Sequence, residues 1–550
     1  MNTAELFIKA LEIEGVEYIF GLAGEENLHF LQALSKSKIK YISTRNEQSA
    51  AFMAATFGRL TGKVGVVLTT LGPGATNLIT AAAYALLGGM PLLMITGQKP
   101  IDSFPQGDFQ IIDFVSVVKP VTKFTKQIVS AKSLAYLVRK AVKIAEAEKP
   151  GPVHLELPKD IAQENVNDNI TPLSLSENIM PVASSASINK VVKLLSSAKL
   201  PLIMIGASAS RHSNSQALIE LVTKFNIPFF DSQMGKGVID ERDPNFLGTA
   251  ALVRNDYIHD VIASSDLIIN VGYESSEKPP YSMVGLRANV IHLNYTPAEI
   301  TEIYFPQLEI VGDIEESIKN ITSQLNMLDM VDIAPFAVDL IAEQKSRIER
   351  STLANQTADN FPILPQRIVG DIRKFMGEND ILALDNGMYK LWFSRSYKVY
   401  QTNTLLLDNA LATMGAGLPS GIAAKLLNPD VKVLVVTGDG GFMMNSQELE
   451  TAVRLNLDLV VLIINDNGFG MIKWEQAEKN FTNFGLDFKN PDFIKLAESY
   501  GAKGYRLTSA SDLIPTLTKA FSGGVALIEV AVDYSENIKV FTHELHNKLA

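Results

Sequence analysis

The chain has 550 residues, a length that predicts about three domains rather than one. Its 60 acidic and 49 basic side chains give a net charge of −11, which argues against a nucleic-acid or anionic-membrane binder, because such proteins present a basic face. The absence of cysteine excludes disulfides, thiolate nucleophiles, iron–sulfur clusters and cysteine-bound zinc, and it fits a reducing cytoplasm.

The N-terminal part predicts neither a targeting signal nor a membrane span. Acidic residues interrupt Met1–Phe20, where a signal peptide needs a basic start and an apolar core. Val64–Gln98 contains no charged residue and exceeds the roughly 20 residues that a membrane span needs. Because Gly72-Pro73-Gly74 and Gly88-Gly89-Met90-Pro91 break it, a strand, a loop, a helix and a second strand are expected there instead.

Short β-branched runs alternate with amphipathic segments through most of the chain. Buried parallel strands are expected at Val64–Thr70, Pro91–Thr96, Pro201–Ile205, Leu267–Val271, Val431–Thr437 and Leu459–Ile464. Connecting segments such as Ser133–Glu148 and Ser446–Arg454 have helical spacing. This alternation predicts an α/β fold with doubly wound parallel sheets.

Two stretches predict linkers between three domains. Asn165–Ser187 is polar and lacks periodicity, and the strand–helix rhythm is lost near Asp329–Phe361. We therefore expect three doubly wound parallel-sheet domains of ordinary size, over residues 1–165, 187–328 and 360–550. Val66–Gly74 in the first and Val433–Gly441 in the third both predict a strand, a Gly-rich turn and a helix. Whether the two domains share an ancestor stays open, since this pattern is common.

The pattern that carries chemistry is Gly438-Asp439-Gly440 followed by Asp466-Asn467-Gly468. Each segment follows an apolar strand, so both are expected at the carboxyl edge of one sheet, where open α/β sheets bind ligands. Glycines let backbone N–H groups approach a phosphate, and Asp439 and Asp466 offer oxygen ligands that suit Mg²⁺ or Ca²⁺, with the carbonyl of Gly468 as a third. Each segment alone reads as a turn. Their pairing behind two strands favours a metal and diphosphate site.

At these residues the chain resembles the thiamine diphosphate-dependent decarboxylases and carboligases, whose signature is Gly-Asp-Gly followed by an Asn/Asp pair. The resemblance runs from Glu5 to Val532, with further segments in the family's order: Phe20–Gly24 (its FGxPG turn), Arg45–Ala54 (RHEQxAAxMA), Leu71–Asn77 (GPGATN) and Thr413–Pro419 (TMGxGLPAA). It implies a pyrimidine-binding first domain, a central flavin-type domain and a diphosphate-binding third domain. It also implies a homodimer or homotetramer with active sites between subunits.

The resemblance assigns roles to single residues. Glu47 is expected to bind the pyrimidine ring, Met414 to hold the cofactor bent, and the carbonyl of Ala412 to bind its amino group. Asp439, Asp466 and Gly468 are the implied Mg²⁺ ligands. Without the resemblance, Glu47 reads as an acid near a helix start and Met414 as core. The other implied contacts to thiamine diphosphate are Gly24, Gly72, Asn77, Asn386, Gly387, Met388, Tyr389, Gly438, Gly440, Gly441, Phe469, Gly470 and Met471, with Lys390 as a weaker one.

The segment Ser103–Asp113 suggests which reaction is catalysed. Decarboxylases that stop at an aldehyde usually place histidines over the cofactor, and Ser103–Asp113 has none. Gly107–Gln110 and Lys119–Phe124 instead resemble the Phe-Gln and PxTK elements of acetolactate synthases. The resemblance thus implies that pyruvate is decarboxylated and the hydroxyethyl enamine joined to a second 2-oxoacid, giving 2-acetolactate and CO2. Gln110 would orient the substrate and Phe109 would shape the pocket.

Some positions depart from the family pattern. Asn46 replaces a His, Ala23 a Pro and Ile111 a Glu, which bears on the substrate more than on the cofactor. FAD is left open but is not favoured, because Gly206–Arg211 and Gly272–Pro279 lack the motifs of flavin-containing synthases.

Alternatives remain at the level of the sequence. They are another thiamine diphosphate-dependent 2-oxoacid decarboxylase, an acyl-CoA lyase or acetyltransferase, and a non-catalytic cofactor-binding subunit. A regulatory small subunit is a further candidate partner. The pathway is left open between branched-chain amino acid biosynthesis and acetoin production.

Overall fold

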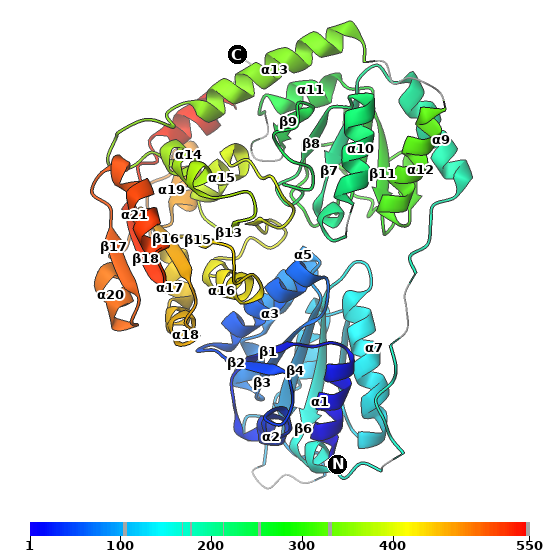
Figure 1. Cartoon of the computed structure of the whole chain (residues 1–550), viewed down its shortest axis with the longest axis vertical. Coiled ribbons are helices and arrows are strands. Elements are labelled where there is room, and N and C mark those ends of the chain that lie inside the picture. The colour runs from blue at the N-terminus through cyan, green and yellow to red at the C-terminus, as the bar shows by residue number, and fades with distance from the viewer. Residues whose placement is uncertain are drawn as a thin grey trace. The chain divides into compact units, whose positions relative to one another are not determined.

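The computed structural model describes residues 1–102, 107–167, 169–175, 179–212, 214–250, 253, 255–327 and 333–545 (Figure 1). Within them the chain forms three six-stranded sheets whose paired strands run parallel, with helices around them, so the predicted α/β fold is confirmed. By its contacts the chain divides into two compact units. One holds Met1–Ile179, Leu418–Asn428 and Asn445–Leu457, and the other holds Met180–Gly417, Pro429–Met444 and Asp458–Ala550.

The first unit contains the sheet β2-β1-β3-β4-β6-β5. Its strands are β1 (Tyr18–Gly21), β2 (Lys40–Ser43), β3 (Gly65–Thr69), β4 (Leu92–Gln98), β5 (Phe124–Gln127) and β6 (Pro152–Pro158). Its main helices are α1 (Thr3–Ile13), α2 (Leu28–Leu34), α3 (Glu47–Thr61), α4 (Pro73–Thr76), α5 (Ile79–Gly88), α6 (Phe114–Val118), α7 (Leu134–Glu146) and α8 (Lys159–Gln163). Every residue of β3, β4 and β6 is buried, which explains why these strands are mostly apolar.

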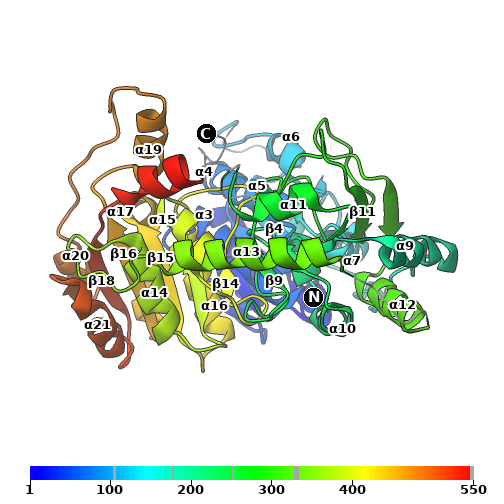
Figure 2. The ribbon, with the colours of Figure 1, turned by 90° about the horizontal axis from the view of Figure 1, so that it is seen from above.

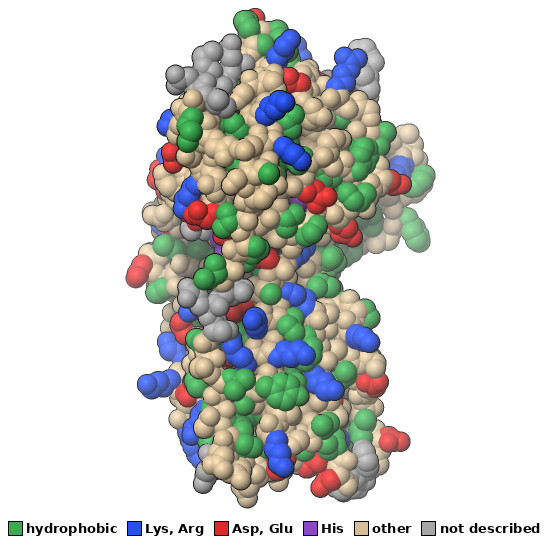
Figure 3. Space-filling view, turned by 90° about the vertical axis from the view of Figure 1, so that its right-hand side faces the viewer, with side chains coloured by type: hydrophobic (Ala, Val, Ile, Leu, Met, Phe, Trp, Pro, Cys, Tyr) green, Lys and Arg blue, Asp and Glu red, His purple; other side chains and the backbone are tan. Residues whose placement is uncertain are grey.

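The uncharged stretch Val64–Gln98 folds as predicted, into β3, α4, α5 and β4. The left-handed Gly89 ends α5, and Gly72, with φ of +51°, opens the turn before α4. Among the described residues, no helix combines the length and apolar character that crossing a bilayer would take. On the face shown in Figure 3, basic and acidic side chains both occur between apolar ones.

The second unit contains a central sheet, β12-β11-β10-β7-β8-β9. Its strands are β7 (Pro201–Ile205), β8 (Phe229–Asp231), β9 (Phe246–Thr249), β10 (Leu267–Val271), β11 (Asn289–Asn294) and β12 (Leu308–Val311). The helices of this part are α9 (Ser185–Ser197), α10 (Ser215–Phe225), α11 (Ile258–Ser264) and α12 (Ile314–Asn326). Separate apolar clusters cover the two faces of the sheet, as a doubly wound fold requires.

The second predicted linker contains a long helix in its described part. The chain from Pro335 to Leu353 forms α13, which Figure 2 shows as one long helix that packs on α11 and β9. Only Ala337 and Gln344 of this helix are buried, so its sequence carries little of the apolar periodicity that predicts a helix. Residues 328–332 lie outside the described part.

The second unit also contains the sheet β14-β13-β15-β16-β18-β17. Its strands are β13 (Ile381–Leu384), β14 (Leu405–Leu406), β15 (Val433–Gly438), β16 (Leu459–Asn465), β17 (Lys503–Arg506) and β18 (Ala526–Ala531). The helices of this unit are α14 (Pro365–Phe375), α15 (Tyr389–Ser396), α17 (Asp439–Asn445), α19 (Gly470–Glu478), α20 (Phe493–Ser499), α21 (Leu513–Ala520) and a π-helical segment, Ile538–Glu544. Two helices from the same stretch of sequence, α16 (Gly417–Leu427) and α18 (Glu448–Arg454), belong almost entirely to the first unit.

The first and third sheets have the same topology. Counting strands along the chain within each sheet, both follow the order 2-1-3-4-6-5, whereas the central sheet differs. The Gly-rich turns that begin at Gly72 and Gly438 both lie at the end of the third strand, β3 in one sheet and β15 in the other. This is the arrangement that the faint sequence repeat would produce if both domains came from one ancestor.

Candidate active site

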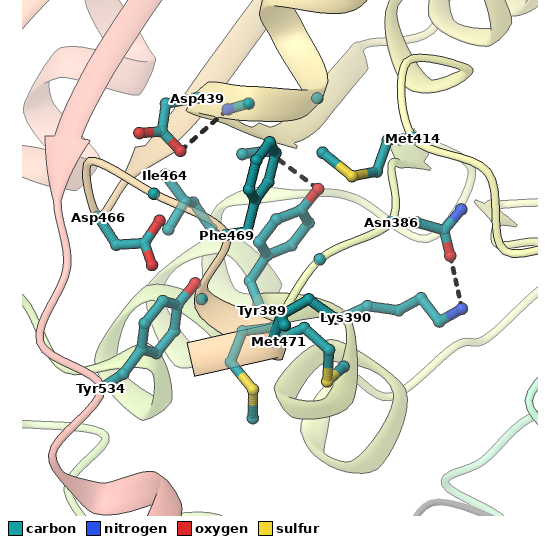
Figure 4. Close-up of a pocket in the computed structure, with 18 of the residues that line it drawn as sticks. Asn386, Tyr389, Lys390, Met414, Asp439, Ile464, Asp466, Phe469, Met471 and Tyr534 are labelled. Atoms are coloured by element: carbon teal, nitrogen blue, oxygen red, sulfur yellow. Dashed lines mark hydrogen bonds between the residues drawn. The ribbon is translucent and has the colours of Figure 1, made fainter. Parts of the chain in front are cut away.

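A cavity of about 230 Å³ lies at the carboxyl edge of the third sheet (Figure 4). It brings together every site residue predicted in the third domain: Asn386, Gly387, Met388, Tyr389, Ala412, Met414, Gly438, Asp439, Gly440, Gly441, Asp466, Gly468, Phe469, Gly470 and Met471. Four further residues line it: Lys390, Ile464, Ile472 and Tyr534. The side chains of Asp439 and Asp466 lie on one side in Figure 4, and Asn386 and Lys390 on the other. The functional roles of these residues stay predictions.

The two acids of the cavity come from neighbouring strands. Asp439 directly follows β15 and begins α17, and Asp466 directly follows β16. Burial raises the pKa of both carboxyls, and the negative charge of Asp439 contributes to raising the pKa of Asp466, to about 7. Two acids so close in a partly dry site destabilise each other's charged form. A bound divalent cation would remove that repulsion, and carboxylate oxygens are ligands that Mg²⁺ takes.

Asn490 orients the first acid, although no sequence motif pointed to this residue. Its side-chain amide donates to Oδ2 of Asp439 at 2.7 Å and to the side-chain oxygens of Asn465 and Asn467 at 3.1 and 3.3 Å. Oδ1 of Asp439 accepts from the N–H of Gly440 at 3.0 Å. Asn490 lies in the loop between α19 and α20 and belongs to neither motif. It comes close to Asp439 only when the chain is folded.

The glycines of the turn after β15 keep the backbone close to aromatic walls. The N–H of Gly438 donates to the hydroxyl of Tyr389 at 2.9 Å. A Cβ on Gly440 would lie 3.0 Å from Cε1 of Phe469 and 3.4 Å from Cε of Met414, tighter than ordinary contacts. A side chain at Gly440 would therefore displace residues that line the cavity. This small, donor-bearing lining suits a diphosphate.

Asp385, at the end of β13, ties three segments of the site together. It is buried, and its carboxylate accepts from the N–H of Asn386 at 2.8 Å, the N–H of Gly415 at 3.0 Å and the hydroxyl of Thr437 at 2.9 Å. Burial raises its pKa to about 6 despite these bonds. Sequence reasoning treated this residue only as the end of a strand, and its polarity after an apolar run was the available signal.

Lys390 places a buried amine at the cavity. Its Nζ donates to Oδ1 of Asn386 at 2.6 Å, to Oδ1 of Asn409 at 3.0 Å and to the carbonyl of Asp408 at 3.2 Å. Burial lowers its pKa to about 8, since transfer out of water disfavours the charged form. Asn386 in turn donates to the carbonyl of Thr413 at 2.7 Å. These bonds connect the loop after β13 to the segment that carries Ala412 and Met414.

In the first unit, Glu47 opens α3 at the carboxyl edge of the first sheet. Asn46 caps this helix by accepting from the N–H of Gln48 at 2.8 Å. Oε2 of Glu47 accepts from the side-chain amide of Asn77 at 2.9 Å. A Cβ on Gly74 would lie 3.2 Å from Oε1 of Glu47, so the turn after β3 lies against this carboxyl. Two predicted residues, Glu47 and Asn77, are thus brought together.

The other residues predicted in the first unit surround the same turn. A Cβ on Gly24 would lie 2.4 Å from Cβ of Thr70, and one on Gly72 would lie 2.9 Å from the carbonyl oxygen of Gln110. Gln110 has a left-handed backbone, with φ of +60°. The ring of Phe109 is 59% exposed. The loop that carries both residues therefore lies over the glycine turn and leaves the aromatic ring uncovered.

A buried ion pair supports this edge of the first sheet. Nζ of Lys99 lies 2.6 Å from Oε1 of Glu26, and the hydroxyl of Thr70 donates to Oε2 at 2.8 Å. Burial alone would favour the neutral acid, but the bonds from Lys99 and Thr70 lower the pKa of Glu26. Lys99 also lies 5.7 Å from the ring centre of Phe109. The family-like motifs pointed to neither Glu26 nor Lys99.

Three family models cover most of the chain. Residues 1–117 match "Thiamine pyrophosphate enzyme, N-terminal TPP binding domain", 188–321 the central domain of the same enzymes, and 385–530 their C-terminal TPP binding domain. The chain is 33% identical to a probable acetolactate synthase large subunit of Methanococcus aeolicus, over 98% of this chain and 93% of the relative. It is 32% identical to the catabolic acetolactate synthase of Raoultella terrigena, over 97% and 95%. An acetolactate synthase of Bacillus subtilis (strain 168) is 31% identical, over 98% and 95%.

Proposed function

Since the chain belongs to the thiamine diphosphate-dependent enzymes, in the family of the acetolactate synthases, we propose that it converts pyruvate to 2-acetolactate. Two molecules of pyruvate and one proton give one 2-acetolactate and one CO2. Thiamine diphosphate, when bound, supplies the carbon nucleophile that attacks the keto carbon and accepts the electron pair left by decarboxylation. The observation that carries the proposal is the third-sheet cavity, where two acids, a glycine turn and Met414 meet.

The third domain would hold the diphosphate end of the cofactor. Asp439 and Asp466 would bind Mg²⁺ through carboxylate oxygens, and Gly468 through its carbonyl. The glycine turn after β15 and the loop at Gly387 would let the backbone approach the diphosphate oxygens. The raised pKa values of the two acids support this assignment, because a cation stabilises their charged forms.

The first domain would hold the pyrimidine end and the substrate. Glu47 would bind the pyrimidine ring, with Asn77 fixing the orientation of its carboxyl. Gln110 has no acidic proton, so it would orient the substrate without protonating it. Phe109 would close the side of the pocket.

We also propose that the active form is a homodimer or homotetramer, in which the first domain of one copy completes the site on the third domain of another. The exposed ring of Phe109 supports this, since a pocket wall needs a covering surface. Met443, Met444 and Ile472, on α17 and α19, are apolar and exposed as well. The name "large subunit" of several relatives supports a regulatory small subunit as a second partner.

The cell compartment and pathway are proposals too. A cytoplasmic location is supported by the absence of cysteine from the sequence. The product would enter branched-chain amino acid biosynthesis or acetoin production. The name "Acetolactate synthase, catabolic" of the Raoultella relative supports the second route.

The test is to incubate the purified chain with Mg²⁺, thiamine diphosphate and pyruvate and to identify the product. We expect acetolactate, which acid converts to acetoin. Acetaldehyde alone would assign a simple decarboxylase instead. Unconsumed pyruvate together with measurable cofactor binding would favour an acyl-CoA enzyme or a non-catalytic subunit, and would overturn the proposal.

Glu47→Gln provides the sharpest variant. It should abolish acetolactate formation while the melting temperature stays within a few degrees of the unchanged chain. Glu5→Gln is the matched control, because Glu5 is also an acid in the first turn of a helix, where it completes the capping box of α1. Equal activity of the two variants would show that Glu47 serves only its helix.

A further inference from the structure

The central sheet has the strand order of dinucleotide-binding domains. From one edge to the other it is β9-β8-β7-β10-β11-β12, so the chain moves outward from β7 to one edge and then outward from β10 to the other. In such sheets a dinucleotide lies in the crevice between these two strands, with its phosphates on backbone N–H groups that follow the first strand. The topology thus puts the expected phosphate position beside Gly206 and Ala207, which follow β7.

A carboxylate of the chain already occupies this position. Oε1 of Glu277 accepts from the N–H of Ala207 at 2.9 Å and from the N–H of Glu274 at 3.1 Å, and Oε2 accepts from the hydroxyl of Ser232. Ser232 directly follows β8. The side chain of Glu277 is 3% exposed. The backbone donor that a phosphate oxygen would take is therefore bonded to an internal anion.

A second acid engages the neighbouring donors. Glu274, in the turn after β10, accepts from the hydroxyl of Ser208 at 2.6 Å and pairs with the guanidinium of Arg211. Ser208 and Arg211 belong to the turn after β7, the same turn that contains Ala207. The arginine and hydroxyl that a phosphate could use at this turn are thus held by a carboxylate of the chain.

The turns themselves pack tightly against one another. A Cβ on Gly206 would lie 2.6 Å from Cα of Tyr273, and one on Gly272 would lie 2.3 Å from the backbone nitrogen of Ala209. A Cβ on Gly235, after β8, would lie 2.1 Å from the carbonyl oxygen of Ile205. The backbones that follow three adjacent strands are in direct contact, so even a methyl group would force them apart.

We propose that Glu277 takes the place of a dinucleotide phosphate, and that the central domain therefore closes its crevice with its own acids and binds neither FAD nor a nicotinamide dinucleotide. A phosphate entering here would meet two buried carboxylates and would first have to displace them from their donors, which is unfavourable. Burial raises the pKa of Glu277 to about 7, because the charged form of the carboxyl is less favourable in this buried place than in water. The FAD that the sequence left open does not fit these residues.

The first test uses the chain loaded with thiamine diphosphate and Mg²⁺. The protein is denatured and the supernatant checked for flavin fluorescence, and the native protein is titrated with FAD and, separately, with NAD by calorimetry. We expect no flavin beyond traces and no saturable binding. One flavin per chain, or saturable binding of either dinucleotide, would overturn the proposal. Acetolactate formation is measured independently on the same sample, so this inference and the proposed function can fail separately.

The second test asks whether the carboxylate is part of the closed fold. Glu277→Ala leaves two buried N–H groups and a hydroxyl without their acceptor, so the melting temperature should fall by several degrees. Glu316→Ala, on the exposed first turn of α12, is the control and should melt as the unchanged chain does. Equal melting temperatures of the two variants would contradict the role given to Glu277. If Glu277→Ala does not fold, the dinucleotide titrations of the unchanged chain still decide.

Discussion

Asp385 offers the clearest test of how the third domain shapes its cavity. Its carboxylate joins the loop after β13, the turn at Gly415 and the end of β15. Ala412 and Met414 precede that turn, and Gly438 follows Thr437. We therefore expect changes at Asp385 to alter cofactor affinity although the side chain is buried beneath the lining of the site.

The magnitude follows from the donors that a substitution would leave without a partner. Asp385→Ala abandons two backbone N–H groups and one hydroxyl in a buried place, at about 1–3 kcal/mol each, so a loss of roughly 3–9 kcal/mol in unfolding free energy is expected. Asp385→Asn keeps one acceptor oxygen, and its amide can donate to Thr437, so about 1–2 kcal/mol is expected. Since burial already raises the pKa of Asp385 to about 6, a neutral amide recovers part of the cost of the charge.

The assay is calorimetric titration of Asp385→Asn with thiamine diphosphate and Mg²⁺, together with thermal unfolding followed by circular dichroism. We expect the dissociation constant to rise about tenfold or more, or roughly 1.4 kcal/mol. Asp380→Asn is the matched control, because Asp380 precedes the same strand at its other end and also accepts backbone N–H groups, from Gly377 and Lys432. Equal cofactor affinity in the two variants would refute the reasoning.

Three further predictions concern residues that line the cavity. Lys390 should be charged below about pH 8 and neutral above it, so the affinity of the unchanged chain for its anionic cofactor should fall as the pH rises through about 8. Lys390→Met should bind the cofactor more weakly at pH 7, and its affinity should not change near pH 8. Identical pH profiles of the two proteins would contradict the reasoning. Gly440→Ala should raise the KM for thiamine diphosphate by displacing Phe469 or Met414, while the melting temperature stays unchanged. An unchanged KM would exclude that displacement. Asp466→Asn should raise the Mg²⁺ concentration needed for half-activation by about tenfold or more, or roughly 1.4 kcal/mol, whereas Asp458→Asn, at the opposite end of β16, should not.

Sequence motifs predicted those cavity residues that directly follow a strand. Gly438 to Gly441, Asp466 and Gly468 to Met471 line the cavity because a parallel sheet brings consecutive strand ends to one edge, whatever the rest of the chain does. Asn490 and Tyr534 were missed, because each comes from a loop or strand end far away in sequence and carries no motif. Lys390 was predicted only as a weaker contact, since nothing in its sequence neighbourhood reveals its burial.

The same limit explains the errors elsewhere in the fold. Apolar runs gave the positions of β3, β4, β7, β10, β15 and β16 to within two residues at their ends, because these strands are buried almost throughout. The exposed α13 gave no such pattern and read as a linker. The acids that close the central crevice could not be predicted either, since Glu277 and Ala207 meet only when three strand ends pack together.

The matching topology of the first and third sheets gives the sequence repeat a physical reading. Each sheet has its Gly-rich turn after the third strand, yet the two turns carry different chemistry. The turn after β3 lies against Glu47, whose carboxyl is bonded to the neutral amide of Asn77. The turn after β15 carries Asp439 beside a second acid, an arrangement that a divalent cation would stabilise. Duplication of one ancestral domain could have kept the glycines of this turn while the polar residues around them changed. The carboxyl edge of one sheet would then suit a heterocycle and that of the other a metal-bound diphosphate, which are the two ends of the proposed cofactor.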